Sequence, residues 1–553
     1  MLLTTPYEEG SNDRPILVLA EAPSNQEIRL EQPLVGPSGA VFNDCLRTAG
    51  LRRSDCYILN IWPFQVEKSR MIGHEEEIYT RGNVGNYTQC LYTKKGFTEL
   101  GIYEARQCIE KLKTAHCNVV LTLGKPALQI MTGDNRPIMK WRGSPLFSEK
   151  FQKKFISTVH PAATLHGVYT WRYMIIADME KVKGEMESPF LELPKRDIIT
   201  NPSFEFVIAY MHEAKTTKKR FATDIEVINH QVNCFCICYE PSQVLVVPMA
   251  DEFGDAWWTE DQEIQIWQLY ADLMGDPEIT KINQNIIGFD APFLLQQNNI
   301  YTNGFIGDTM VAQKIMYPDF RKGLDFITSI HTREPYYKDE GKMWKGLGGD
   351  LEQFWRYNGK DGCVALESWD ALAAEMTEGG YWPTYNRVMR LAKPIQYMTV
   401  RGMKVDHEAL KRTHKDVEKK ISEKQAELDS VAQVPFNVSS PKQCQNYFYG
   451  IKGITPYMSG KGTVTTDDKA MARIYRRYNL PEAKLVQEIR ALRKLKGTYL
   501  EVDFDKDSRV RCSWDPTGTW TGRLSSSQTV FGTGMNMQNL HPEFKNFLVA
   551  DDD

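Results

Sequence analysis

The amino-acid sequence predicts a multidomain protein of the α/β and α+β classes, with a last third that is mainly helical. Two observations indicate this fold class. Apolar runs typical of strands alternate with helical stretches to about residue 380, and long, heavily charged helices follow. The length of 553 residues suggests about three or four domains. We expect sections at 1–190, 203–380 and 381–553.

Composition and charge narrow the class of protein. The formal net charge of −4 gives no global sign of a nucleic-acid binder, so a basic DNA-binding surface would have to be local. The eleven cysteines form no CxxC pairs of the kind that hold zinc, and we expect them to be reduced. No apolar run approaches the roughly 18 residues of a membrane span, and the start lacks a signal-peptide core. We therefore expect a soluble cytoplasmic protein with no membrane partner.

The first section mixes short strands with helices. RPILVLAEAP (14–23), VVLTLGKPALQIM (119–131) and FISTVHPAA (155–163) each join an apolar strand to a turn or loop. This alternation is typical of an α/β layer architecture. The polar, proline-bearing stretch 187–202 marks the first predicted domain boundary.

Two carboxylates on one predicted strand are the main chemical signal of the second section. RFATDIEV (220–227) places Asp224 and Glu226 two residues apart, so their side chains point to the same face of the strand. Two like charges on a half-buried surface repel each other and lose hydration. A bound divalent cation would offset that penalty. On its own, an Asp-x-Glu pair on a strand usually marks a solvated face.

Further acidic positions follow along the same section. Asp290 comes where an apolar strand breaks and a helix would begin, and Asp308 has a similar context. Tyr357 and Asp361 are four residues apart and share one face of a predicted helix. Converging carboxylates suit magnesium or manganese. Two such ions about 3.5–4 Å apart can activate a water molecule and stabilise a leaving oxygen in phosphodiester hydrolysis.

The order of these motifs resembles that of the DnaQ-like DEDDy 3′→5′ exonucleases, specifically the proofreading domain of family A DNA polymerases, over roughly residues 203–380. The resemblance implies an RNase H-like fold, two magnesium or manganese ions and a single-stranded DNA 3′ end as substrate. It implies that Tyr357 orients the attacking water and that Asp290 holds the second ion. The implied metal ligands are Asp224, Glu226, Asp290 and Asp361.

Two neighbouring residues have less defined roles. The resemblance implies that Asn285, in the run N-x-x-x-F-D, supports the site or contacts the DNA strand. For Asp308, the commoner role of an aspartate just before a helix is an N-cap.

The third section resembles the thumb and the start of the palm of family A DNA polymerases. Two long helices are predicted at 407–431 and 481–500. More specific is WTGRLSSSQTVFGTGMNMQNLHPEF (520–544), which resembles the TGRLSS…NLQN signature of that family. In the family this segment runs along the minor groove of the primer–template, so the resemblance implies DNA as a partner.

The resemblance also implies particular DNA contacts. Arg523 would reach into the minor groove, where mostly shape and acceptor positions are read. Gln538 and Asn539 would contact sugars or base edges. Basic side chains of the second long helix would meet backbone phosphates, which gives salt-dependent and sequence-independent affinity. These basic residues are Arg490, Arg493, Lys494 and Lys496.

The last residues, FLVADDD (547–553), precede the point where the palm aspartates of family A polymerases come. We do not interpret Asp551–Asp553 as those carboxylates, because the spacing after QNL is too short. We expect no polymerisation by this chain alone, with a C-terminal polymerase portion as a further partner. A truncated chain, an incomplete reading frame and one piece of a split polymerase remain the alternatives.

The first section resembles the uracil-DNA glycosylase superfamily, nearest its family 4-like branch, over about residues 14–180. The resemblance rests on 20–42, YILNIWPF (57–64) and STVHPAATL (157–165). It implies an α/β/α sandwich with a pocket for a flipped base. In that pocket Asn60 would read the uracil edge, Glu21 would lie near the sugar and the attacking water, and His160 would stabilise the departing uracil anion.

Two departures from that family bear on activity. Leu34 stands where a phenylalanine would stack on uracil, and Cys90 and Cys108 have no upstream partners, so we predict no iron–sulfur cluster. The pocket would serve base excision, or DNA binding and sensing of template uracil. Such a fusion resembles some bacteriophage family A polymerases, which implies replication in a host cytoplasm. The alternatives are a DNA-binding fragment with a silent nuclease and a uracil repair enzyme with an attached exonuclease.

Overall fold

The computed structural model describes residues 7–551, apart from 71–76, 81–89, 342–349, 461 and 506. The chain forms two compact units, one of residues 1–286 with 300–389 and the other of residues 287–299 with 390–553. Among the described residues, no helix combines the length and the apolar character needed to cross a bilayer.

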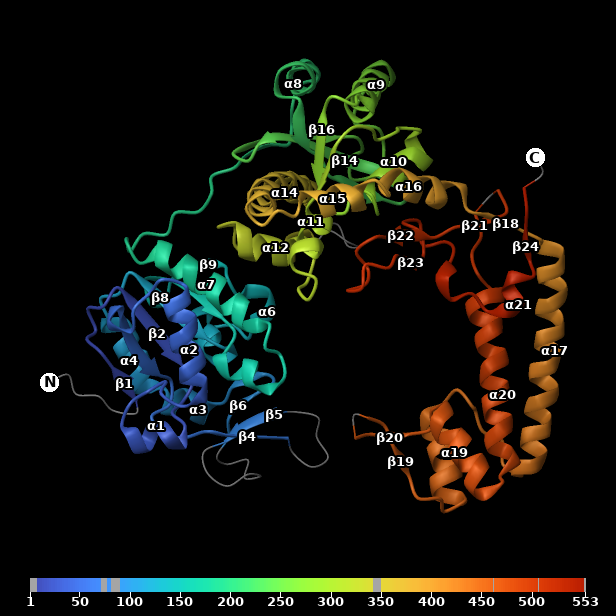
Figure 1. The fold of residues 1–553 in the computed structure, drawn as a ribbon, viewed down its shortest axis with the longest axis horizontal. Helices are drawn as coiled ribbons and strands as arrows, with labels where there is room; N and C mark the ends of the chain where they lie inside the picture. The colour runs from blue at the N-terminus through green and yellow to red at the C-terminus, as the bar shows by residue number, and fades with distance from the viewer. Residues whose placement is uncertain are drawn as a thin grey trace. The chain divides into compact units, whose positions relative to one another are not determined.

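The first sheet of the first unit is the middle layer of an α/β/α sandwich, as predicted (Figure 1). Its strand order is β1-β3-β2-β8-β10-β9; the four central strands are parallel and the two edge strands are antiparallel to their neighbours. Leu17 and Leu19 share a core with α4 and α5, while Ile16 and Val18 share the other core with α2 and α7. Burial on both faces explains why the central strands are continuously apolar.

The elements of this part have the following bounds. The strands are β1 Glu8–Glu9, β2 Ile16–Ala20, β3 Cys56–Asn60, β8 Val119–Leu123, β9 Pro145–Ser148 and β10 Lys153–Thr158, with a separate sheet of β4 Glu67–Arg70, β5 Glu77–Thr80, β6 Cys90–Thr93 and β7 Gly96–Phe97. The helices are α1 Asn25–Leu30, α2 Pro37–Thr48, α3 Glu99–Glu104, α4 Arg106–Thr114, α5 Lys125–Thr132, α6 Ile138–Trp141 and α7 Trp171–Glu185.

A second, mixed sheet follows in the same unit, with the order β11-β15-β14-β12-β16-β17 and β13 paired to β14. The predicted meander is present: β12 and β13 both pair antiparallel with β14, and β14 pairs antiparallel with β15. The sheet begins at β11, ahead of residue 203, since β11 pairs with β15. The strands are β11 Asp197–Ile199, β12 Arg220–Ala222, β13 Ile225–Ile228, β14 Gln231–Glu240, β15 Gln243–Pro248, β16 Thr280–Asn283 and β17 Ile306–Asp308. The helices are α8 Phe204–Glu213, α9 Glu260–Gly275, α11 Thr309–Met316, α12 Leu324–His331, α14 Leu351–Glu378 and α15 Trp382–Met389.

Helix α14 lies unusually close to this sheet because two of its residues have no side chain. A Cβ atom at Gly359 would come within 2.6 Å of Ile198 Cγ2, and one at Gly362 would come within 2.6 Å of Cys236 Sγ. Real Cβ contacts are not that short, so both positions require glycine at this spacing. The small cysteine side chains on β14 serve the same close approach, with Cys238 Sγ 3.9 Å from Cys363 Sγ.

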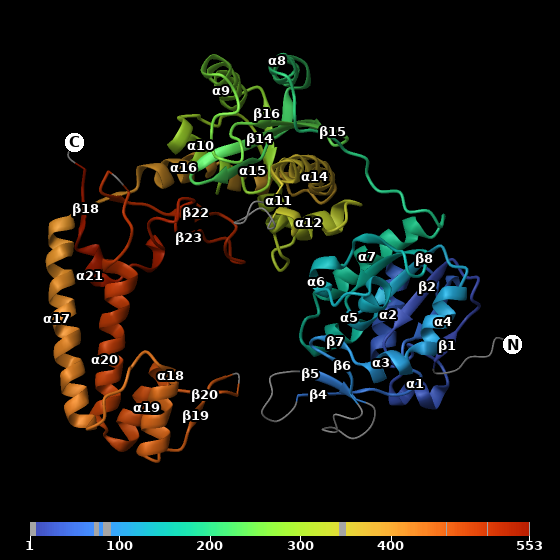
Figure 2. The same ribbon diagram turned by 180° about the vertical axis from the view of Figure 1, so that it is seen from behind.

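The second unit is mainly helical. Helices α17 and α20 pack side by side, as both views show (Figures 1 and 2). The predicted helix at 407–431 is confirmed, while the one at 481–500 ends as an α-helix at Leu495 and continues as a π-helical turn. The helices are α10 Asp290–Asn298, α16 Ala392–Arg401, α17 His407–Ala432, α18 Pro441–Gln445, α19 Asp468–Tyr478, α20 Pro481–Leu495 and α21 Pro542–Lys545. The strands are β18 Met403–Val405, β19 Tyr457–Met458, β20 Val464–Thr465, β21 Arg509–Val510, β22 Ser513–Asp515, β23 Ser525–Ser527 and β24 Leu548–Val549.

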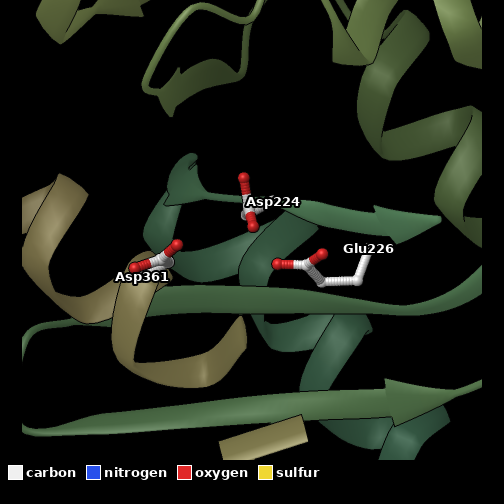
Figure 3. A group of neighbouring side chains, drawn as sticks. All are labelled: Asp224, Glu226 and Asp361. Carbon is white, nitrogen blue, oxygen red and sulfur yellow. The ribbon is translucent and has the colours of Figure 1, made fainter. Parts of the chain in front are cut away.

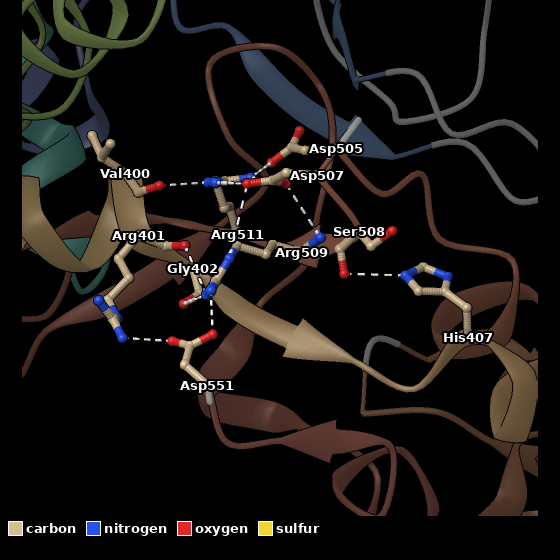
Figure 4. A network of polar contacts seen from close by, with 10 residues as sticks. All are labelled: Val400, Arg401, Gly402, His407, Asp505, Asp507, Ser508, Arg509, Arg511 and Asp551. Atoms are coloured by element: carbon tan, nitrogen blue, oxygen red, sulfur yellow. Dashed lines mark hydrogen bonds and ion pairs between the residues drawn. The ribbon is translucent and has the colours of Figure 1, made fainter. Parts of the chain in front are cut away.

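An arginine–aspartate network surrounds the three-stranded sheet β21-β18-β24 of this unit (Figure 4). Arg511 donates to Asp505 at 2.6 Å and to Asp507 at 2.5 Å. Arg401 donates to Asp551 at 2.5 Å, and Arg509 contacts the same carboxylate. Every carboxylate of this network therefore faces a guanidinium group.

Candidate metal centre

Three of the predicted acids converge in the first unit. One carboxylate oxygen from each of Asp224, Glu226 and Asp361 lies within 4.8 Å of the other two. Asp224 sits between β12 and β13, Glu226 is on β13, and Asp361 is on α14. Figure 3 shows the three side chains pointing toward one another. A set of hard carboxylate oxygens at this separation fits a magnesium or manganese ion.

Asp224 is held in place by two amide side chains. Asn283 Nδ2 donates to Asp224 Oδ1 at 3.2 Å, and Asn358 Nδ2 donates to Asp224 Oδ2 at 3.1 Å. Burial raises the pKa of Asp224 to about 7, and the negative charge of Asp361 adds to that rise. The opposing influences are Lys338 and the two amide hydrogen bonds. Without a cation, this carboxylate therefore carries an electrostatic penalty.

Asp361 is held by two residues from the segment that precedes α14. The Tyr337 hydroxyl donates to Asp361 Oδ1, and Lys338 Nζ donates to Asp361 Oδ2 at 2.5 Å. Lys338 Nζ also lies 3.1 Å from the Tyr357 hydroxyl. Both oxygens of Asp361 thus have a fixed donor, which sets the orientation of the carboxylate.

Tyr357 lies on α14 one turn before Asp361, as the spacing predicts. Burial, and then the charges of Asp361, Glu226 and Asp224, raise the pKa of Tyr357. Its hydroxyl therefore keeps its proton and can donate a hydrogen bond beside the carboxylates.

Asp290, Asp308 and Asn285 complete the predicted set, and none of them belongs to the three-carboxylate group. Asp290 is the first residue of α10, is buried, and belongs to the second unit; it is not part of the three-carboxylate group. The prediction that it holds a second ion stays a prediction.

Asp308 caps α11 by accepting from Met310 N and Val311 N at 3.0 and 3.2 Å, so its predicted cap is confirmed. The Asn285 amide N–H also donates to Asp308, at 3.1 Å.

Sequence reasoning missed four residues that support this centre. They are Asn283, Tyr337, Lys338 and Asn358. Asn358 directly follows Tyr357 and Asn283 ends the strand before Asn285, so motif spacing could have suggested both. Nothing local in the run EPYYKDE (334–340) indicates that it reaches Asp361.

The glycosylase-like residues gather at one edge of the first sheet. Glu21 follows β2, Asn60 ends β3 and His160 follows β10, and these strands are parallel. Carboxyl ends of parallel strands form the ligand edge of an open sheet. Glu21 and Asn60 are buried. His160 Nδ1 accepts from Ala162 N at 3.2 Å, so the neutral ring carries its proton on Nε2.

Leu34, which stands where the resemblance expects a phenylalanine, packs into the hydrophobic core of the first domain. Its side chain is buried in the hydrophobic core that also contains Phe42 and Leu46 of α2. Its backbone has a φ of 49°, which is uncommon for a leucine.

The basic residues of the third section differ in how exposed they are. Arg490 is used internally, because it donates to Val438 O at 2.8 Å and to Thr466 O at 2.5 Å. Arg493 donates to Asn437 Oδ1 and Ser439 Oγ, both at 3.0 Å.

Lys494 is exposed, whereas Lys496 pairs with Glu418 at 2.6 Å. Arg523 and Asn539 are exposed. Gln538 Nε2 donates to Leu524 O at 2.7 Å, which brings the TGRLSS and NMQN segments together.

Comparison with known protein families gives a match in the N-terminal part and another in the C-terminal part of the chain. Residues 7–172 match the sequence model of the uracil DNA glycosylase superfamily, and residues 407–549 match that of DNA polymerase family A. The chain contains a domain of each family. Both resemblances, and the fold class that they imply, are thereby confirmed.

Two curated relatives agree with this assignment. DNA polymerase I of Rhizobium leguminosarum is 27% identical over 282 residues, which are 48% of this chain and 27% of that protein. The chain thus matches about a quarter of the length of this relative. The type-4 uracil-DNA glycosylase of Thermotoga maritima is 27% identical over 178 residues, which are 32% of this chain and 80% of that protein. A solved structure, the POL domain of Pol1 from M. smegmatis in complex with DNA primer-template and dNTP, aligns with a TM-score of 0.48 at 18% identity, covering 64% of this chain and 57% of that one.

Proposed function

We propose that this protein is a DNA-processing enzyme of the DNA polymerase I type in which residues 203–380 remove 3′-terminal nucleotides from DNA. The observation that supports this most is the convergence of Asp224, from between β12 and β13, with Glu226 of β13 and Asp361 of α14. Magnesium or manganese bound there would supply an activated water and neutralise charge at the scissile phosphodiester. The proposed setting is phage-type replication in a host cytoplasm.

The chain's own residues would share the work as follows. Asn283 and Asn358 keep Asp224 in place, and Tyr337 and Lys338 do the same for Asp361. The protonated Tyr357 hydroxyl would orient the attacking water. Asp290 is the proposed holder of a second ion. Positioning of this kind contributes to catalysis because the reacting groups need no rearrangement.

The family A match supports a place for residues 407–549 in an enzyme of the nucleotidyltransferase type, and we propose that they bind the primer–template without polymerising DNA on their own. The exposed Arg523, Asn539 and Lys494 are the proposed DNA contacts. Arg490, whose guanidinium already bonds two backbone carbonyls, is better suited to holding α20 against the loops around it.

A labelled substrate tests the nuclease proposal. Single-stranded DNA carrying a 5′ label should be shortened one nucleotide at a time in magnesium, and EDTA should stop the reaction. Replacing Asp224 by alanine should slow hydrolysis by more than about a hundredfold, which exceeds the usual effect of losing an outer-shell partner. Asp319→Ala, which removes an exposed carboxylate of the same section, is the matched control and should act like wild type. Equal rates for Asp224→Ala and wild type would disprove the site assignment.

Uracil excision is a second candidate function, favoured by the placement of Glu21, Asn60 and His160 at one sheet edge. A duplex with one uracil, incubated with the protein and then treated with alkali, should break at the uracil if the base is removed. Asn60→Ala should abolish the break. An intact strand with retained binding would favour the DNA-binding role.

A further inference from the structure

A short segment links the glycosylase-like domain to the metal centre. Residues 333–339, here called the strap, follow α12 without forming a helix or strand of their own. The whole strap lies in the first unit, as do both parts that it contacts. Its contacts alternate between the glycosylase-like domain and Asp361.

Three residues of the glycosylase-like domain hold one side of the strap. The Tyr336 N–H donates to Ser144 Oγ at 3.1 Å. The rings of Tyr336 and Trp141 lie with their centroids 5.2 Å apart. Lys140 Nζ pairs with Asp339 at 3.2 Å. Ser144 is buried, so its hydrogen bond to the strap is shielded from water.

The other side of the strap contacts Asp361 of the candidate metal centre. Tyr337 and Lys338 donate to the two oxygens of Asp361, as described above. Tyr336 and Tyr337 are neighbours in the chain. A shift of Tyr336 away from Ser144 and Trp141 would therefore move the two neighbouring donors that fix Asp361.

The strap is anchored on a rigid base. Arg142 and Asp178 form an ion pair at 1% and 0% side-chain exposure, and Arg142 also donates to Ser329 Oγ of α12 at 2.9 Å. Lys181 on α7 donates to the carbonyl oxygens of Ser329 and Thr332 at 2.7 and 2.6 Å. Buried charges held by several bonds resist displacement. The end of α12 from which the strap starts is thus fixed to the glycosylase-like domain.

We propose that the glycosylase-like domain positions Asp361 through the strap, and that Trp141 and Ser144 are positioning residues for 3′-end hydrolysis. This inference rests on the proposed function of the metal centre. It gives the first domain a role in the nuclease reaction that is independent of uracil. The physical basis is that groups hydrogen-bonded to a metal ligand set its orientation and thereby the affinity of the site.

The test uses the full chain and two readouts. The variant Trp141→Ala/Ser144→Ala should bind manganese about tenfold more weakly, measured by calorimetry without DNA, because Asp361 loses its fixed orientation. Its kcat on the 5′-labelled strand should fall by a similar factor with KM for DNA unchanged. Tyr173→Ala, which removes an exposed aromatic ring of α7, is the matched control and should keep both values. Trp141→Phe, which retains a ring against Tyr336, should restore most of the affinity.

A double-mutant cycle decides whether the strap carries the effect. In a Tyr337→Phe/Lys338→Met background, both strap donors to Asp361 are already lost, so the Trp141→Ala change should add little. Full additivity would overturn the proposal, and so would wild-type manganese affinity and kcat in the Trp141→Ala/Ser144→Ala variant. Melting curves exclude general unfolding, and Ser144→Ala alone replaces the double variant if the latter fails to fold. A wild-type chain that neither binds manganese nor shortens DNA would refute the proposed function itself, which is a separate result.

Discussion

The three-carboxylate group and the arginine–aspartate network both consist of acidic side chains, but the pKa of an aspartate is shifted in opposite directions in the two places. In the network, the hydrogen bond from Arg511 lowers the pKa of Asp507, and that from Arg509 lowers the pKa of Asp551. In the metal centre, burial raises the pKa of Asp224. Carboxylates that pair with arginines hold chain segments together. In the three-carboxylate group the negative charges are not fully balanced by nearby basic side chains, which favours the binding of a cation from solution.

The largest expected difference concerns hydrolysis. Asp361→Asn should reduce the rate of 3′-end removal by more than about a hundredfold, since it removes a ligand rather than an outer-shell partner. Arg511→Met, which breaks the network, should leave the rate unchanged when measured below the melting temperature. A network variant as inactive as the ligand variant would show that the two regions do not differ in function.

Metal binding should stabilise only one of the two regions. Magnesium or manganese at about 100 times its dissociation constant should add about 2.7 kcal/mol to the free energy of unfolding of the first unit. Asp224→Asn should abolish this gain, whereas Asp507→Asn should not alter it. Thermal melting with and without EDTA measures the effect. A gain that persists in Asp224→Asn would place the ion elsewhere.

Breaking the network should cost stability directly. Arg511→Met removes hydrogen bonds to Asp505, Asp507 and Val400 O, and leaves the half-buried Asp505 and the exposed Asp507 without this guanidinium group. We expect a loss of about 1–3 kcal/mol in the second unit. Urea unfolding followed by a probe in that unit checks this. Lys419→Met, which removes an exposed lysine of α17, is the control and should lose less than about 1 kcal/mol.

The smallest expected effect is an opposite response to pH in protein freed of metal. The raised pKa of Asp224 means that its contribution to stability is present below the unfolded value and is lost as the pH rises through about 7. The lowered pKa of Asp507 means that its contribution is present at neutral pH and is lost as the pH falls below about 4. Melting temperatures of Asp224→Asn and Asp507→Asn between these limits should therefore deviate from wild type with opposite signs.

Local sequence rules accounted for part of the candidate site. The four-residue spacing of Tyr357 and Asp361 on a helix depends only on backbone periodicity, and it was met. The predicted strand at 220–227 is interrupted instead: β12 ends at Ala222 and β13 begins at Ile225, so Glu226 is on a strand and Asp224 lies between the two strands. The approach of Asp361 to Asp224 and Glu226 depends on how α14 packs against the sheet, and backbone periodicity alone does not predict that packing. Here the order of the motifs carried the prediction.

The contacts that local patterns did not predict have a different cause. A basic helix face predicts phosphate contacts, yet Arg490 meets carbonyl oxygens of residues 438 and 466, which come from loops far away in the sequence. Likewise, no local motif marks Tyr337 and Lys338, which donate to Asp361 only because the fold places the strap beside it. Long-range contacts made by common side chains leave no local pattern to read.

The absence of a Cβ atom at two positions of α14 sets the distance of Asp361 from Asp224 and Glu226. Gly359 and Gly362 let α14 rest directly on the sheet. An alanine at either place would lift the helix as one body, carrying Tyr357 and Asp361 away together while altering no ligand. Such a change would weaken the proposed 3′-end hydrolysis gradually, whereas substitution of one of the three carboxylates would abolish it.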